Sequence, residues 1–521
     1  MQIVEGNRAL LVKTADPANI TGVIPKSHVL TKDSTGAEVA VNWGHGEASA
    51  LADLGYMDTP SPILKNYTWT GRYTPFDHQK TTASFLSIRK RAFCFNEQGT
   101  GKTASVIWAA DYLLNRNEIK RVLVLCPLSI MKSAWQKDMF TFAMHRSCDV
   151  AHGTPKQRKK VLAAPTQFVI INFDGVGVVE DEIIAGGFDL IVVDEASAYK
   201  NSQTNRWKVL NRILNATQAR LWMLTGTPAA QSPLDAYGLA KLVNPNGVPR
   251  YYGAFRDKVM YKLTQFKWMP KPQAESVVHQ VLQPAIRFEK KDCLDLPPVT
   301  FVEREALLTP MQRKYYNELK NEMLVEAAGE DISAVNAAVK INKLLQISGG
   351  AVYTDTGEIV EFDVSNRINA VLEVIDETSN KVLVFVPFTH TIELIREALE
   401  KHGVSCAVIN GRVPVNRRSE IVEEFQTKAS PRVLIIQPQA ASHGLTLTAA
   451  DTIIWYAPVT SVETYLQANA RIDRPGQVNP MTIVHIRGSE VESRLYSMLQ
   501  NNIDNHEKII DLYRQVTNES A

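Results

Sequence analysis

The sequence predicts an α/β protein in which two tandem parallel-sheet lobes are joined by a helical connecting region and preceded by a small N-terminal β-containing module. Three observations support this prediction. Short aliphatic runs alternate with helical stretches over residues 71–245, the alternation stops over 246–365, and it resumes over 366–500. Continuous apolar runs are typical of strands buried on both faces of a parallel sheet. Repeated strand–helix alternation is the pattern of an α/β fold.

Residues 1–70 differ from the rest of the chain. The stretch "QIVEGNRALLVKT" shows the short apolar–polar alternation of a half-buried strand. Pro, Gly, Asn and Asp then interrupt the residues that follow. These features predict a small β-containing module. We expect this module to take part in choosing the substrate.

The first lobe, 71–245, contains five candidate strands. Each is a short apolar run that ends near a turn: "RAFCF", "RVLVLCP", "QFVIINF", "FDLIVVDE" and "ARLWMLTG". The intervening stretches "TASVIWAADYLLNR" and "RWKVLNRIL" carry apolar residues at helical spacing. This order of elements predicts a parallel sheet with helices between its strands.

The connecting region and the second lobe follow. Residues 246–365 include the Pro-rich "KWMPKPQ" and a predicted long helix from Pro310 to Ile347. The second lobe, 366–500, again contains buried-strand candidates: "KVLVFVP", "SCAVING", "PRVLIIQP", "DTIIWYAP" and "MTIVHIRG". We expect residues 501–521 to form a C-terminal helical tail.

Composition excludes several classes of protein. Hydrophobic residues make up 45% and charged residues 21% of the 521 positions, as in globular proteins. No run approaches the roughly 18–20 apolar residues that span a bilayer, and the N-terminus lacks a secretory pattern. The five cysteines are scattered singly, which argues against a zinc ribbon or a disulfide framework. We therefore expect a monomeric, cytoplasmic protein with no membrane contact, whose net charge of +2 leaves nucleic-acid binding to local patches.

The stretch "FCFNEQGTGKT" has the strand, glycine-rich turn and helix start of a phosphate-binding loop. Gly99 and Gly101 allow the backbone from Gly99 to Thr103, Thr100 included, to curl around a phosphate. The helix that begins near Lys102 adds the positive end of its dipole. Lys102 would reach the β- and γ-phosphates, and Thr103 would give its hydroxyl to Mg²⁺. The alternative without a function is an ordinary glycine turn.

Asn96 stands where the strict phosphate-loop spacing has glycine. This departure leaves the anion-facing residues in place. We therefore expect the loop to bind a nucleotide in spite of it.

The strand "FDLIVVDE" ends in two carboxylates, Asp194 and Glu195. Open α/β sheets bind ligands at the carboxyl ends of their strands. One carboxylate can hold Mg²⁺ and the other can polarise water. An isolated pair would more simply be a solvated strand end, but a pair that follows a phosphate loop favours ATP hydrolysis.

The stretch "YLQANARIDRPGQ" in the second lobe holds Gln467, Arg471 and Arg474. Their spacing also fits a polar helix face that ends at Pro475. The functional alternative is an arginine finger, in which a guanidinium stabilises charge on the γ-phosphate. This alternative explains why one chain carries two similar lobes.

Taken in order, these motifs resemble a superfamily 2 helicase-type ATPase, and within it the Swi/Snf-type branch of double-stranded DNA translocases. "TPFDHQ", "NEQGTGKT", "VLVLCPLSIMKSAWQKD", "VDEAS" and "LTGTP" match motifs of the first lobe, and "KVLVFVPF", "ASHGLTLTAADTIIWYAP" and "QANARIDRPGQ" match those of the second. The resemblance covers about residues 70–500 and suggests a phage or bacterial member. It implies two RecA-like lobes.

The resemblance also implies roles for individual residues. Lys102, Thr103 and Asp194 would hold Mg-ATP, Glu195 would orient or deprotonate the attacking water, and Gln79 would recognise adenine. Arg471 and Arg474 would act on the nucleotide from the second lobe, with Gln467 beside them. The residues expected to face the nucleic-acid backbone are Pro127, Lys132, Thr389, Thr446 and Thr448.

Three functions remain open on the sequence. The first is ATP-driven translocation on double-stranded DNA, to remodel forks, branched DNA or DNA-bound protein. The second is strand separation by a DNA or RNA helicase, which requires a wedge that the sequence does not reveal. The third is regulation of a DNA-bound protein partner such as a polymerase.

Overall fold

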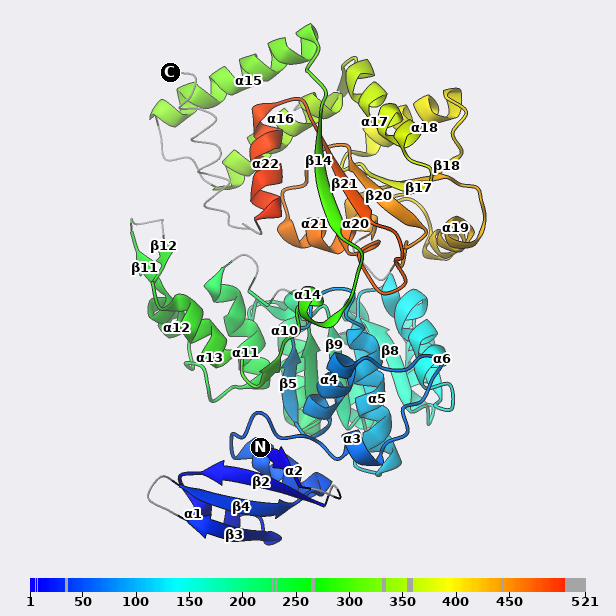
Figure 1. The fold of residues 1–521 in the computed structure, drawn as a ribbon. Coiled ribbons are helices and arrows are strands. Elements are labelled where there is room, and N and C mark those ends of the chain that lie inside the picture. Colours follow the sequence, from blue (N-terminus) through cyan, green and yellow to red (C-terminus); the bar gives the residue numbers. More distant parts are fainter. Residues whose placement is uncertain are drawn as a thin grey trace. The chain divides into compact units, whose positions relative to one another are not determined.

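The computed structural model describes residues 1–501 except 5, 7, 33–35, 227, 230–231, 264–267, 330–333, 354–358 and 442–444. The chain comprises two compact units, Met1–Cys293 and Leu294–Ala521 (Figure 1). The predicted C-terminal tail, 501–521, lies outside the described residues except for Asn501. None of the helices within the described residues has the length and apolar character needed to cross a lipid bilayer.

The N-terminal part of the first unit is a small antiparallel sheet. Its strands lie in the order β1-β2-β4-β3, with bounds β1 Gln2–Ile3, β2 Ala9–Thr14, β3 Ser27–Lys32 and β4 Ala37–Asn42. Helices α1 (Pro17–Thr21) and α2 (His45–Asp53) accompany this sheet. Alternate residues such as Leu10 and Val12 are buried on one face of it. The predicted β-containing module is confirmed.

The main sheet of the first unit has seven strands in the order β13-β5-β10-β9-β6-β8-β7, and all of its pairs are parallel. The strand bounds are β5 Arg91–Cys94, β6 Val122–Cys126, β7 Cys148–Ala151, β8 Phe168–Asn172, β9 Leu190–Asp194, β10 Arg220–Leu224 and β13 Ala285–Ile286. Alternate residues enter two different cores: Phe93 and Leu123 belong to one, and Cys94 and Val124 to the other. The sheet is therefore buried on both faces, which explains why its strands read as continuous apolar runs.

The helices of the first unit connect these strands. Their bounds are α3 Ile63–Asn66, α4 Asp77–Ser87, α5 Lys102–Asn115, η1 Met131–Gln136, α6 Lys137–Phe142, α7 Pro155–Ala163, α8 Phe173–Val176, α9 Glu180–Ala185, η2 Ala196–Tyr199, α10 Asn205–Thr217, η3 Pro233–Asp235, α11 Ala236–Val243, α12 Tyr252–Val259, α13 Ala274–Val281 and α14 Lys290–Cys293. A short hairpin, β11 (Met260–Lys262) with β12 (Trp268–Pro270), follows α12. Helix η1 is a π-helix, a form that occurs frequently at functional sites.

The second unit contains a six-stranded parallel sheet in the order β14-β21-β20-β17-β19-β18. Its strands are β14 Val299–Glu305, β17 Lys381–Phe385, β18 Cys406–Ile409, β19 Val433–Ile436, β20 Ala450–Trp455 and β21 Met481–Arg487. The other elements are α15 Pro310–Gly329, α16 Ala334–Gly349, β15 Ala351–Tyr353, β16 Ile359–Glu361, α17 Ser365–Glu377, α18 Thr389–Lys401, α19 Val415–Thr427, α20 Pro438–Ala441, α21 Val462–Asn469 and α22 Glu490–Gln500.

The predicted α/β class with two parallel-sheet lobes is confirmed by these two sheets. The ten strands predicted for the two lobes are present, whereas β7, β13 and β14 of the parallel sheets and the short hairpin strands β11, β12, β15 and β16 were not predicted. The single long helix expected over Pro310–Ile347 is wrong, because helices α15 and α16 pack against each other there. The domain limits at 245 and 365 remain predictions; α12, α13 and β13 belong to the first unit, and β14, α15 and α16 to the second.

A candidate nucleotide and nucleic-acid site

The phosphate loop of the first unit runs from the end of β5 to the start of α5. Gly99 has φ 84° and Gly101 has φ 80°, both in the left-handed region that favours glycine. A Cβ on Gly101 would lie 2.1 Å from Nε2 of Gln79, so a larger residue would displace the Gln79 side chain from the loop. Lys102 opens α5 and its Nζ donates to the carbonyls of Asn96 (2.8 Å) and Glu97 (3.1 Å). The loop therefore curls tightly around its own lysine.

Two side chains from the start of α4 hold the loop from outside. Gln79 donates through Nε2 to the carbonyl of Thr100 (3.2 Å), and its Oε1 accepts from the backbone N–H of Phe76 (3.0 Å). His78 Nε2 lies 2.8 Å from the same Thr100 carbonyl. The imidazole stacks on the exposed ring of Phe76 at a centroid distance of 5.6 Å. The structure thus brings Gln79 into direct contact with the phosphate loop.

Asn96, the departure from the strict motif, is a buried connector. Its Nδ2 donates to Oγ1 of Thr82 in α4 (2.8 Å), and its Oδ1 accepts from the backbone N–H of Phe288 (3.0 Å). Glycine could make neither bond. No local pattern points to Phe288, which is 192 residues away.

Asp194 closes β9 at the same edge of the sheet as the phosphate loop. The register places Cys94, Leu224 and Asp194 level on the adjacent strands β5, β10 and β9. Two strand spacings separate the outer pair by about 10 Å. The loop begins after Cys94, so it lies at the same edge of the sheet as the carboxylate of Asp194.

The carboxylate of Asp194 is buried and hydrogen-bonded. Its Oδ2 accepts from the indole N–H of Trp135 (2.8 Å), and its Oδ1 accepts from the backbone N–H of Glu195 (3.0 Å). Burial raises the pKa of Asp194, while the Trp135 hydrogen bond and the charge of Lys102 act to lower it. Trp135 lies on the π-helix η1 and is fully buried. Sequence reasoning did not identify Trp135, because nothing in its spacing points to Asp194.

Glu195 has an unusual backbone. Its φ is 55°, and it caps the short helix η2 from the left-handed region. Left-handed conformations of residues other than glycine are uncommon and cluster at functional sites. This geometry turns the chain sharply after Asp194, so the two carboxylates face different surroundings.

A magnesium ion would find suitable oxygen ligands here. Mg²⁺ prefers one or two protein oxygens together with substrate phosphates and water. Asp194 offers a carboxylate, and Thr103 offers a hydroxyl in the first turn of α5. Among the described residues, no cluster of three or more His, Cys, Asp or Glu side chains has the arrangement of a metal site. A carboxylate and a hydroxyl are oxygen donors of the kind that Mg²⁺ takes.

The candidate arginines of the second unit lie in the turn after α21, not on a helix face. Arg471 is buried; its Nε donates to the carbonyl of Gln467 (2.8 Å) and its Nη1 to that of Leu445 (3.2 Å). Arg474 is half-buried and donates through Nη1 to the Leu445 carbonyl (3.0 Å) and to Oγ1 of Thr446 (2.7 Å). The structure thus brings Gln467, Arg471, Arg474 and Thr446 together.

The residues expected at nucleic acid follow strands in each unit. Pro127 comes directly after β6, and Lys132 is exposed on η1. Thr389 opens α18 after β17, and Thr448 accepts at Oγ1 from Gln426 (3.4 Å). Their contacts with nucleic acid remain predictions.

Two protein families match this chain. The SNF2-related domain matches residues 78–350, more than half of the chain, and the helicase conserved C-terminal domain matches residues 366–476. The fold and the site together define a helicase-type ATPase core with two RecA-like sheets. The chain belongs to the SNF2-related domain family.

Individual relatives are more distant. The chain is 25% identical to an uncharacterized ATP-dependent helicase of Mycoplasma genitalium, over 78% of this chain and 39% of that protein. It is 26% identical to putative protein p41 of Acyrthosiphon pisum secondary endosymbiont phage 1, over 80% of this chain and 93% of that protein. The solved SWI2/SNF2 ATPase core of Sulfolobus solfataricus in complex with dsDNA has a TM-score of 0.41 and 21% identity, over 83% of this chain and 92% of that chain. The chain spans less than half the length of the first curated relatives it matches.

Proposed function

We propose that this chain is a nucleic-acid-stimulated ATP hydrolase that moves on double-stranded DNA and remodels forks, branched DNA or DNA-bound protein. The proposal rests on the register of three strands: Cys94 of β5 and Asp194 of β9 both pair with Leu224 of β10, which lies between them. This register brings a phosphate loop and a buried carboxylate to one sheet edge. Membership of the SNF2-related domain family supports the same reaction.

In the proposed reaction, the backbone of the loop from Gly99 to Thr103 binds the phosphates of ATP, and Lys102 turns from the carbonyls of its own loop towards the β- and γ-oxygens. Thr103 and Asp194 would hold Mg²⁺, which would supply charge neutralisation on the phosphates. Glu195 accepts a proton from the attacking water. Gln79, anchored to the loop through Thr100, contacts the adenine.

Arg471 and Arg474 are proposed to complete the reaction from the second unit. Each would exchange a hydrogen bond to a backbone carbonyl for one to the γ-phosphate as charge develops there. Pro127, Lys132, Thr389, Thr446 and Thr448 would contact the phosphates of the nucleic acid. Backbone contacts carry little sequence information, which suits a motor that moves over any sequence.

The Glu195→Gln variant tests the assignment of the base. We expect ATP and DNA binding to persist while turnover falls by about 10²- to 10⁴-fold, the usual contribution of a general base. ATPase rate and nucleotide affinity are measured on the same preparation. Glu180→Gln, on α9 in the same unit and paired with Arg212, is the matched control and should keep full turnover. Near wild-type ATPase in Glu195→Gln would remove Glu195 from the mechanism.

A panel of nucleic acids distinguishes the proposed translocase from a strand-separating helicase. ATPase is measured with blunt duplex, single strands, branched DNA and RNA. Stimulation by duplex together with triplex displacement supports translocation. Stimulation by single strands alone, with duplex unwinding, indicates a strand-separating helicase. The cytoplasmic location, the monomeric state and a protein partner on DNA remain predictions.

A further inference from the structure

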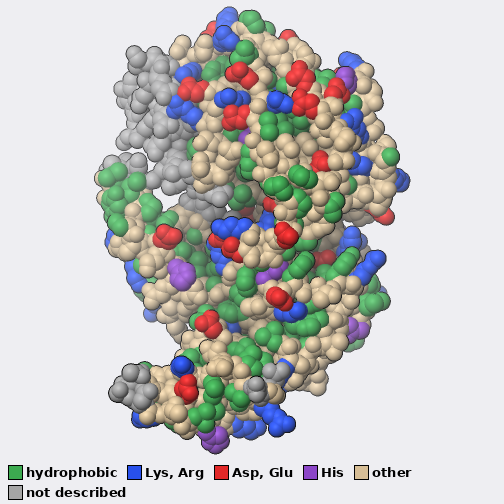
Figure 2. All heavy atoms as spheres, in the orientation of Figure 1, with side chains coloured by type: hydrophobic (Ala, Val, Ile, Leu, Met, Phe, Trp, Pro, Cys, Tyr) green, Lys and Arg blue, Asp and Glu red, His purple; other side chains and the backbone are tan. Residues whose placement is uncertain are grey.

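A groove on the first unit lies beside η1 and α6 and has no role in the proposed nucleotide chemistry. Its volume is about 740 Å³, within the range of ligand-binding clefts. Thr70, Gly71 and Arg72 approach the end of α6 and form one side. Figure 2 shows blue and green side chains on the part of the surface where Figure 1 labels α6, so cations and apolar groups gather there.

Close backbone packing fixes one wall of this groove. Arg72 N–H donates to the carbonyl of Thr141 (3.1 Å), and Oγ1 of Thr70 donates to that of Phe142 (2.6 Å). A Cβ on Gly71 would lie 2.8 Å from the Phe142 Cα, so only glycine permits the approach. This wall of the groove is therefore set by the backbone.

The groove is cationic. Arg72, Lys132 and Lys137 line it, and among the described residues that line it none is a carboxylate. Nε2 of His145, also in the lining, lies 2.9 Å from Oδ1 of the buried Asp111 carboxylate, which also accepts from Arg146. An anionic occupant is the one that this charge distribution favours.

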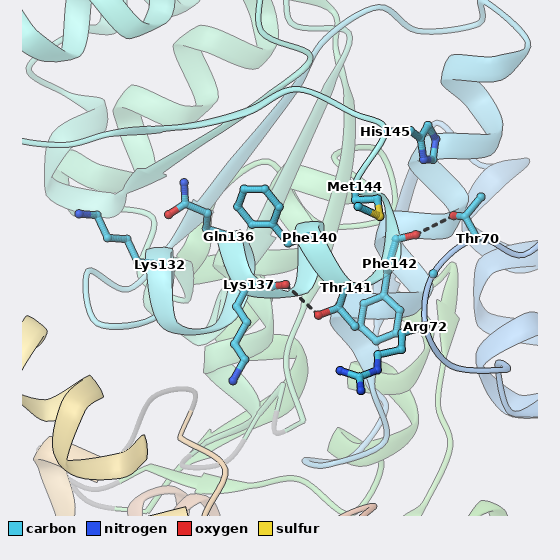
Figure 3. Close-up of a pocket in the computed structure, with 11 residues that line it drawn as sticks. Thr70, Arg72, Lys132, Gln136, Lys137, Phe140, Thr141, Phe142, Met144 and His145 are labelled. Atoms are coloured by element: carbon cyan, nitrogen blue, oxygen red, sulfur yellow. Dashed lines mark hydrogen bonds between the residues drawn. The ribbon is translucent and has the colours of Figure 1, made fainter. Parts of the chain in front are cut away.

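An exposed aromatic ring, that of Phe140, lines the groove together with the cations. Phe140 is 65% exposed, which is unusual for a large apolar side chain. Lys132, Gln136 and Phe140 follow one another at four-residue spacing. Figure 3 shows Gln136 and Phe140 on one side of the helix, with Lys137 and Arg72 pointing to the other side. An exposed ring and several cations around one groove combine a surface that stacks bases with charges that track a phosphate backbone.

The geometry points to an unpaired segment of nucleic acid as the occupant: we propose that one base stacks on Phe140 while Lys132, Lys137 and Arg72 neutralise the adjacent phosphates. An acidic peptide would satisfy the cations, but a peptide anchor normally fills an enclosed, desolvated pocket. Phe140 and Met144, which is 78% exposed, stand out from the surface instead. This inference rests on the proposed function and narrows its substrate to DNA with a single-stranded part, such as a fork.

Binding without ATP tests the inference on the full chain. Fluorescence anisotropy is measured with a labelled oligothymidylate and with a blunt duplex of the same length. We expect Phe140→Ala to weaken oligothymidylate binding about 5- to 100-fold, the range for loss of one stacked base. Duplex binding should stay unchanged, and Phe140→Trp should restore single-strand affinity. Tyr251→Ala, which removes another exposed aromatic of the same unit, is the control and should have no effect.

Salt dependence gives a second readout. Each phosphate contact that is lost on a single strand lowers the slope of log K against log salt by about 0.7. The Lys137→Ala variant should show this reduced slope for oligothymidylate only.

Wild-type single-strand binding by Phe140→Ala would overturn the inference, and so would an equal loss of duplex binding. A competition experiment adds poly-glutamate at equal charge concentration to bound oligothymidylate. If poly-glutamate displaces the oligonucleotide from the parent protein but not from Phe140→Ala, the groove binds an acidic protein partner, and the inference is also overturned. None of these outcomes tests the proposed function, which fails if duplex DNA does not stimulate ATP turnover.

Discussion

The bond between Trp135 and Asp194 shows how one residue can tune a site from a distance in sequence. The indole N–H donates to a buried carboxylate whose pKa burial already raises. The π-helical turn directs Trp135 inward, while Lys132 on the same turn is exposed. One irregular turn therefore serves both the proposed nucleotide site and the cationic groove.

Trp135→Phe keeps an aromatic ring in the core and removes only the donor to Asp194. A hydrogen bond to a charged group contributes about 1.5–3 kcal/mol, so we expect stimulated ATP turnover to fall by about ten- to a hundredfold. Trp222→Phe is the matched control, because Trp222 is equally buried and donates to the carbonyl of Arg89. It should lower thermal stability but keep turnover. Equal losses of turnover in both variants would mean that the effect is general.

At the scale of elements, the phosphate loop is held by its neighbours as much as by its own glycines. Gln79 and His78 of α4 contact the carbonyl of Thr100 in the loop. Asn96, the first residue of the loop, bonds to Thr82 in α4 and to Phe288, which follows β13. The segment after edge strand β13 is thereby connected to the loop. The residue that departs from the strict motif is the one that makes this connection.

Asn96→Gly restores the glycine of the strict motif and should nevertheless harm the protein. It removes two buried hydrogen bonds and adds chain entropy to the unfolded state, so we expect a loss of about 2–4 kcal/mol in the free energy of unfolding. Urea denaturation and ATP titration measure the two effects. Asn96→Ala removes the same bonds without the added flexibility and should show most of the loss. Tighter ATP binding by Asn96→Gly at unchanged stability would contradict the connecting role.

At the scale of the whole molecule, each unit has its own cores and its own buried histidine. His45 lies in α2 of the first unit, and His485 lies in β21 of the second, stacked on Tyr496 at 4.0 Å and 2.9 Å from the Tyr465 hydroxyl. Burial lowers the pKa of each histidine to about 4. Both units therefore carry a neutral imidazole that resists protonation.

These lowered pKa values predict acid sensitivity. An unfolded histidine binds a proton near pH 6.5, but the folded His485 does so only near pH 4. The free energy of unfolding is therefore highest above about pH 6.5 with respect to this histidine. It decreases as pH falls towards 4, by about 3 kcal/mol for one such group. We expect His485→Phe, which keeps a ring against Tyr496, to flatten the pH dependence of the second unit's melting only. Parallel pH profiles for the variant and the parent would refute this.

The ten strands that the sequence predicts are those with continuous apolar runs, because burial on both sheet faces leaves an unmistakable pattern. The three strands of the parallel sheets that were not predicted lack that pattern. Strand β13 has two residues and β7 has four, while β14, "VTFVERE", alternates along an edge. The expected helix over 310–347 joined two segments of similar composition that pack against each other as α15 and α16. Short-range pattern does not record which segments become neighbours.

The sequence by itself determined the α/β class, the phosphate loop from Gly99 to Thr103 and the carboxylates that end β9, since all three depend on residues adjacent in the chain. Only the tertiary structure decided the partners: Trp135 with Asp194 across 59 residues, and Asn96 with Phe288 across 192. The cationic groove also depends on tertiary structure, because it forms where the backbone at Gly71 packs against Phe142. The reason is physical, because hydrogen bonds and close approaches depend on strand order and packing, which no local spacing encodes.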